Sequence, residues 1–214
     1  MNDLHRATPI REPPAHRPLL VVVEGANDIE FLVRLSRRLS QGDDAIPNLQ
    51  QLNNAGSIVF VPAGGGNLAS WTDRFEPLRC PEFHLYDREI PPETERRLEV
   101  VSYVASRRGC RAFVTGKRAL ENYLHPLAIA AAGGGQVHFG DDDCVTGIVA
   151  RTWYEPGRIW ADLPKCARAR FSQRTKRWLN TVAVEQMTAE LLRESDPADD
   201  IRRWLKIIGH MTAD

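Results

Sequence analysis

Apolar residues gather in four short runs along the first part of the chain, and a polar segment with a glycine or an acid follows each run. The runs cover residues 19–23, 57–61, 83–86 and 111–115, and their β-branched and aromatic residues favour strands. After the first run, Leu32, Leu35 and Leu39 recur at helical spacing, which predicts an amphipathic helix. A second long helix is expected over residues 91–108, where Pro91 and Pro92 suit a first turn.

Repeated βα units of this kind predict the class of fold. We expect an α/β protein with a doubly wound, mainly parallel, Rossmann-like sheet of four strands and right-handed crossovers. Residues 1–17 are predicted to be a flexible segment, residues 18–132 the α/β domain, and residues 133–214 a helical extension that packs on it. The polar residues 41–56, which include Gly42, Pro47 and Gly56, are predicted to form a connection.

The first βα turn holds two acids. Glu24 follows the first apolar run, and Gly25 permits a sharp turn with positive φ. Asn27 is the predicted helix cap, with Glu30 as its reciprocal partner, and Asp28 lies beside it. Taken alone, this turn is as consistent with a solvated acid and a charge that complements the helix dipole as with a ligand site.

Acids also follow the third and fourth predicted strands. The carboxyl ends of parallel strands lie on one edge of a sheet, so these side chains are expected to converge. The acids are Glu24, Asp28, Asp87, Glu89 and Glu121. Converging carboxylates repel one another unless a cation lies between them, and oxygen ligands favour Mg²⁺ or Mn²⁺. The residues themselves therefore indicate metal-dependent phosphoester chemistry or a metal-bound regulatory pocket.

Composition excludes several classes of protein. The 214 residues contain 28 basic and 28 acidic side chains, so any contact with nucleic acid must come from a local patch. The four cysteines are scattered without a Cys-x-x-Cys pair, which argues against a zinc site or a disulfide framework. No apolar run has the length of a membrane span or of a signal-peptide core, so we expect a cytoplasmic protein without membrane contact.

A basic stretch over residues 165–177 is the best candidate for contact with a phosphate backbone, because it contains no acid. A solvated helix face is an equally good interpretation. The residues assigned to nucleic acid are Lys165, Arg168, Arg170, Arg174 and Arg177.

Three further segments are less specific. The glycine run at residues 62–66, with Asn67 as the cap of a short helix over residues 68–75, suits a tight turn better than a nucleotide site. Residues 140–143, with three consecutive aspartates, favour a solvated loop or a helix cap over another metal ligand. Residues 184–192 predict one helix, and residues 195–197 predict the cap of a last helix whose apolar face packs into the core.

The sequence Val-Val-Val-Glu24-Gly-x-x-Asp28, the glycine turn after the second strand and Tyr-Asp87-x-Glu89 resemble the TOPRIM domain of topoisomerases, bacterial primases and several nucleases. Leu120-Glu121-Asn-Tyr-Leu124 and a later helix with Lys176 resemble the OLD (overcoming lysogenization defect) nucleases. The resemblance covers about residues 18–210 and is strongest up to residue 124. Two features depart from the family: Glu89 stands where aspartate is usual, and the sequence has no Walker motif for the ATPase domain that OLD nucleases carry.

This resemblance implies that the five acids bind one or two Mg²⁺ or Mn²⁺ ions and that Lys176 lies near the scissile phosphate. The expected function is that of a metal-dependent DNA nuclease or nickase, with Glu24, Asp87 and Lys176 as catalytic residues and Glu24 also as a possible proton acceptor. One alternative is a metal- and DNA-binding subunit that needs a separate ATPase or another partner, and a homodimer is also an open option. A second alternative is a receiver-like domain, with Asp87 as phosphoacceptor and Lys117 nearby.

Overall fold

The computed structural model describes residues 17–65, 68–154 and 160–213. The expected flexible segment, apart from Arg17, and the predicted cap at Asn67 lie outside these residues. None of the helices in the described ranges is long and apolar enough to cross a membrane.

Four short parallel strands form one sheet, as predicted, with the strand order β2-β1-β3-β4. The strands are β1 (Leu19–Val23), β2 (Ile58–Pro62), β3 (Glu82–Tyr86) and β4 (Cys110–Val114). Every residue of β1 and β3 is buried, because these two strands lie in the middle of the sheet and are covered on both faces.

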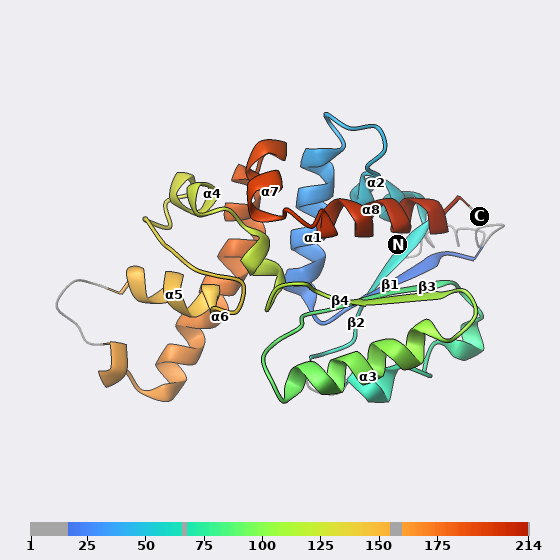
Figure 1. Ribbon diagram of the computed structural model, residues 1–214, viewed down its shortest axis with the longest axis horizontal. Coiled ribbons are helices and arrows are strands. Elements are labelled where there is room, and N and C mark those ends of the chain that lie inside the picture. Colours follow the sequence, from blue (N-terminus) through green and yellow to red (C-terminus); the bar gives the residue numbers. More distant parts are fainter. Residues whose placement is uncertain (1–16, 66–67, 155–159, 214) are drawn as a thin grey trace, which may run out of the picture.

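Helices cover both faces of the sheet (Figure 1), which confirms the α/β fold. Leu19, Val21 and Val23 of β1 contribute to a large core together with α1 (Ala26–Leu39), α2 (Leu49–Ala55) and α8 (Asp200–Met211). The alternate residues Leu20 and Val22 belong to a smaller core, which α3 (Glu93–Ala105) and a 3₁₀ helix at Leu68–Trp71 cover. The strand period of two residues therefore separates the two cores.

The C-terminal part consists of helices that share the larger core with the sheet. They are α4 (Pro126–Ala131), α5 (Val145–Thr152), α6 (Lys165–Thr181), α7 (Ala189–Ser195) and α8. Short 3₁₀ helices lie at Glu76–Leu78, Leu120–Tyr123, Trp160–Asp162 and Ala183–Gln186. Helix α6 packs against α1, and Leu179 of α6 and Trp204 of α8 are completely buried.

The start of α1 differs from the prediction. The cap is Gly25, whose φ of −159° is extended, so the turn does not use the left-handed conformation that only glycine adopts readily. Asn27 lies inside the helix. The Asp28 carboxylate accepts a hydrogen bond from the Gly25 N–H at 2.8 Å, and this contact replaces the predicted cap. The same side chain therefore begins the helix and faces the end of the sheet.

Two other segments also differ. Helix α2 lies within the predicted connection, where the Asn48 side chain accepts hydrogen bonds from the Gln50 and Gln51 N–H groups and Gly56 ends the helix with φ of 78°. Residues 184–192 form a 3₁₀ helix and α7, with a break at Met187. The last helix is capped from the predicted segment, because Asp196 accepts from the N–H groups of Asp200 and Ile201.

Candidate functional site

Three acids meet beyond the carboxyl ends of β1, β3 and β4. Asp28 comes from the first turn of α1, Asp87 follows β3, and Glu121 lies in the 3₁₀ helix after β4. Each of them is no more than 4% exposed. Parallel topology explains this convergence, because it directs the strand ends to one edge of the sheet.

Burial and mutual repulsion disfavour the charged forms of these acids. Burial, together with Glu121, raises the pKa of Asp28 to about 6, although Lys176 and the Gly25 N–H oppose the shift. The pKa of Asp87 is raised well above its ordinary value, first by burial and then by the charges of Asp28 and Glu121. Held carboxylates of this kind attract a cation.

Lys176 of α6 provides a cation within this group. Its Nζ lies 3.6 Å from Glu121 Oε1 and 3.8 Å from Asp87 Oδ2. Burial alone would lower the pKa of Lys176, but Glu121, Asp87 and Asp28 outweigh burial and raise it. The resemblance placed Lys176 near these acids, and the fold of α6 across α1 brings it there.

Asn180, which lies on α6 like Lys176, holds the Glu121 side chain. It is completely buried, and its Nδ2 donates to Glu121 Oε1 at 2.6 Å and to the Lys176 carbonyl at 2.7 Å. Asp87 is fixed in a similar way, because its Oδ1 accepts from the Leu120 N–H at 3.0 Å. Protein groups thus orient both carboxylates that face Lys176.

Glu24 lies at the same sheet edge but has different partners. Its Oε1 accepts from the Asp87 N–H at 2.9 Å and forms an ion pair with Arg97 of α3, which is 4% exposed. Its Oε2 lies against the glycine turn after β2, where a Cβ atom on Gly65 would come within 2.6 Å. A side chain at position 65 would therefore require the Glu24 carboxylate to shift, and position 64 favours glycine because φ is 79° there.

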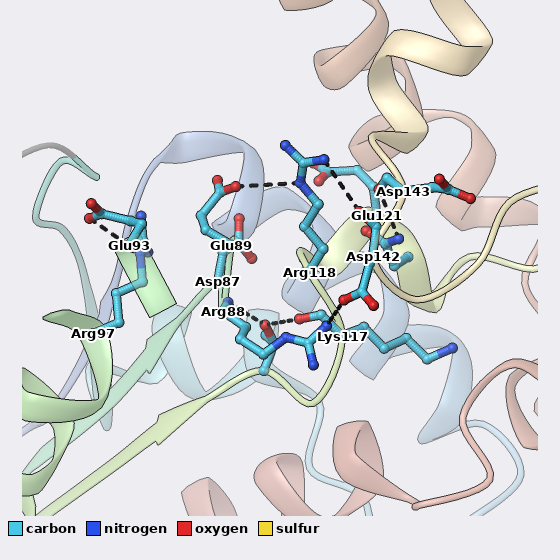
Figure 2. Close-up of polar contacts among 12 residues, drawn as sticks. Asp87, Arg88, Glu89, Glu93, Arg97, Lys117, Arg118, Glu121, Asp142 and Asp143 are labelled. Atoms are coloured by element: carbon cyan, nitrogen blue, oxygen red, sulfur yellow. Dashed lines mark hydrogen bonds and ion pairs between the residues drawn. The ribbon is translucent and has the colours of Figure 1, made fainter. Parts of the chain in front are cut away.

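Glu89 is directed away from the buried acids. Its backbone has φ of 57°, and its carboxylate points toward Arg118, with Oε2 3.5 Å from Nε (Figure 2). The Glu89 N–H also donates to the Arg118 carbonyl at 2.8 Å. Of the five predicted ligands, Asp28, Asp87 and Glu121 surround Lys176, Glu24 contacts Asp87 through the backbone, and Glu89 pairs with Arg118.

The carboxylate oxygens of these acids are ligands that suit a hard cation. In this structure, however, Asp87 and Glu121 face the ammonium of Lys176. Among the residues that the structure describes, no group of three or more His, Cys, Asp or Glu side chains is arranged as a metal site. A cavity of about 190 Å³ borders the cluster, and Glu89, Arg118, Glu121 and Lys176 line it. The side chain of Lys176 is 31% exposed, so it has room to turn away from the carboxylates.

The basic stretch forms the first part of α6. The side chains of Lys165, Arg170, Arg174 and Arg177 are exposed, and no described carboxylate lies within ion-pair distance of them. Arg168 is partly buried, and its Nε has no hydrogen-bond partner among the described residues. Arg170 and Arg174 thus share an exposed face of α6, whereas Lys176 and Asn180 lie on another.

Lys117 has a different partner from the one that a receiver-like domain requires. Its Nζ lies 2.7 Å from Asp141 Oδ1 and 5.5 Å from the centre of the Tyr123 ring. The lysine that faces Asp87 is Lys176. These contacts leave the receiver-like alternative without its lysine.

Two site residues, Arg97 and Asn180, were missed by reasoning from the sequence. Arg97 precedes Val101 and Val104 by four and seven residues, a spacing that places it on the buried face of α3. Asn180 lies four residues after Lys176 and so shares its helix face. Helical spacing is the signal that could have found both.

A scan against protein-family models gave no match, and searches of curated proteins and of solved structures gave none either.

Proposed function

We propose that this chain is a TOPRIM-type, Mg²⁺- or Mn²⁺-dependent DNA nuclease or nickase that resembles the nuclease domain of OLD proteins. The observation that carries the proposal is the buried group of Asp28, Asp87 and Glu121 with Lys176 between them. Buried acids with raised pKa values cost stability, and such an arrangement is typical of a functional site.

In this proposal Asp28, Asp87 and Glu121 would hold the metal ion, and Glu24 would support them through its contact with the Asp87 N–H. The ion supplies charge neutralisation and water activation for phosphodiester hydrolysis. Lys176 turns from the carboxylates toward the phosphate and stabilises its growing negative charge. Arg97 and Asn180 position Glu24 and Glu121.

The test is nicking of supercoiled plasmid by the purified full chain with Mg²⁺ or Mn²⁺, with and without a chelator. We expect nicking that the chelator abolishes and that Asp87→Asn lowers by about 10²-fold or more. Asp44→Asn, which neutralises an exposed acid away from the cluster, is the matched control. Equal activity of Asp87→Asn and Asp44→Asn would contradict the proposal.

A second candidate is a metal- and DNA-binding subunit that acts only with a separate ATPase or other partner. The position of Lys176 favours this candidate. Its ammonium lies between Asp87 and Glu121, where it would block a metal ion, and a partner could move it away. Duplex binding by fluorescence anisotropy distinguishes the two candidates. Binding without nicking under all metal conditions supports the subunit, and binding with nicking supports the nuclease.

A further inference from the structure

Three cations that the sequence left without a nucleic-acid role lie beside the acid cluster. Arg88 follows Asp87 at the end of β3, and Lys117 and Arg118 follow β4. Figure 2 shows the side chains of Arg88 and Arg118 next to Asp87 and Glu89. The two strand ends are joined here, because the Arg88 N–H donates to Thr115 Oγ1 at 2.8 Å and this hydroxyl donates to the Lys117 carbonyl at 2.7 Å.

The acidic loop at residues 140–143 covers these cations. Asp142 forms an ion pair with Arg88, and Asp141 Oδ1 lies 2.7 Å from Lys117 Nζ. The loop backbone is held independently, because the Arg118 N–H donates to the Asp141 carbonyl at 2.7 Å and Arg118 Nη1 donates to the Asp142 carbonyl at 3.3 Å. Neutralising the two carboxylates would therefore leave the loop attached.

The exposure of the two sides is unequal. The side chains of Asp141 and Asp142 are 64% and 77% exposed, whereas those of Lys117 and Arg88 are 15% and 30% exposed. The two carboxylates thus lie between the cations and the solvent, on the side from which a ligand would approach the cations. Because exposed ion pairs contribute little to stability, a phosphate group can replace such a carboxylate at small cost.

We propose that Arg88, Lys117 and Arg118 bind the phosphate backbone of duplex DNA, and that the carboxylates of Asp141 and Asp142 occupy this place until DNA displaces them. The inference rests on the proposed function, since it concerns the same substrate at the same sheet edge. Of the three cations, Arg118 lines the same cavity as Glu121 and Lys176, so a strand bound at Arg118 lies next to the acid cluster. The loop would then weaken non-specific binding by competing with phosphate.

Single neutralisations within the loop test this proposal. Asp142→Asn removes the partner of Arg88, whereas Asp143→Asn removes the same charge from an acid whose Oδ2 accepts from the Gly140 N–H and can be replaced by an amide oxygen. Affinity for a fluorescent duplex is measured by anisotropy in chelator at several salt concentrations. We expect Asp142→Asn to bind about threefold to fivefold more tightly than Asp143→Asn, as one exposed ion pair permits. Equal affinities of these two variants would overturn the proposal.

The cations are tested by Arg88→Gln in the wild-type and Asp142→Asn backgrounds. We expect Arg88→Gln to abolish the gain from Asp142→Asn, because both changes act on one phosphate contact. A gain that persists without Arg88 would overturn the pairing.

Inorganic tripolyphosphate, measured by calorimetry on the same variants, separates this inference from the proposed function. A gain in tripolyphosphate affinity for Asp142→Asn, with no binding of duplex by any variant, supports the anion site and overturns DNA as its ligand, and with it the proposed function. Plasmid nicking together with equal binding by Asp142→Asn and Asp143→Asn leaves the proposed function intact and overturns the role of the loop.

Discussion

At the scale of single residues, Lys176 determines the electrostatics of the site. It faces acids from α1, from the end of β3 and from the segment after β4, and its charge offsets part of their repulsion. Burial, together with the remaining repulsion, still raises the pKa values of Asp28 and Asp87. The site therefore stores unfavourable charge in the absence of a further cation.

Asp87→Asn is expected to make the chain more stable without metal. The ionised form of Asp87 is disfavoured in the folded state, and the amide keeps an oxygen for the Leu120 N–H. The free energy of unfolding should therefore rise, because the amide removes a charge that burial and the neighbouring acids disfavour. Thermal melts with and without Mn²⁺ measure it, and Mn²⁺ should stabilise the wild type more than the variant. A wild type that gains no stability from metal would show that the ligands are misassigned.

Lys176→Met is expected to destabilise the chain in a pH-dependent way. The pKa of Lys176 is raised on folding, so its charge contributes fully at neutral pH. Without it the unfolding free energy should fall by about 2 kcal/mol at pH 8, less than for a fully buried pair because the side chain is partly exposed. The loss should shrink toward pH 5, because the pKa of Asp28, already about 6 with the lysine present, rises further and the folded state takes up protons. Lys165→Met, at the exposed start of the same helix, should show no such pH dependence in the same melts.

The acids and their partners differ in how far they could be predicted. Asp28 and Asp87 follow apolar runs, so strand topology alone placed them at one edge. The direction of Glu89 could not be predicted, since it depends on a left-handed backbone at that residue and on Arg118 from the next strand. A local sequence pattern cannot predict which side chain from a distant segment will pair with a given residue.

At the scale of elements, α6 separates two tasks by face. Lys176 and Asn180 lie four residues apart and point toward the acids, while Arg170 and Arg174 share an exposed face. Helical periodicity alone produces this division. Helix α2, by contrast, has too few apolar residues to show a helical period. Its ends are set instead by the caps at Asn48 and Gly56.

The division of α6 predicts two different phenotypes. Arg170→Ala with Arg174→Ala should weaken duplex binding at all sequences and reduce the salt slope by about two, since each lost phosphate contact removes nearly one released counterion. Lys176→Ala should bind nearly normally and lose about 10²-fold in turnover, because its contact forms with the transition state. Anisotropy and nicking rates on the same variants measure both. Small and equal effects would identify α6 as an ordinary solvated helix.

At the scale of the whole molecule, the sheet and the C-terminal helices depend on one another. Trp204 of α8 is completely buried, packs edge-on against Tyr123 at 5.7 Å between ring centres, and belongs to the same core as β1. Tyr123 in turn donates to Asp200 Oδ2 at 2.8 Å and accepts from the Gly116 N–H. The predicted boundary at residue 132 thus crosses a continuous core.

Trp204→Ala should therefore destabilise the sheet as well as α8. Truncation of a buried aromatic side chain costs about 3 to 5 kcal/mol. Denaturant unfolding followed by circular dichroism should show one transition with a lower midpoint. Tyr103→Ala, which shortens a half-exposed aromatic residue of α3, is the control and should cost much less. Two separate transitions in the variant would show that the α/β part is stable alone.

The position of Lys176 along the chain also has a consequence for synthesis. A growing polypeptide leaves the ribosome with its acids first, because Glu24, Asp28, Asp87 and Glu121 all precede the lysine. Until α6 emerges, the nascent sheet edge has its acids but not the ammonium that completes them. A translation product that stops before this helix would carry every proposed metal ligand but would lack Lys176. On the proposed function, the order of residues therefore delays cleavage until α6 has been synthesised.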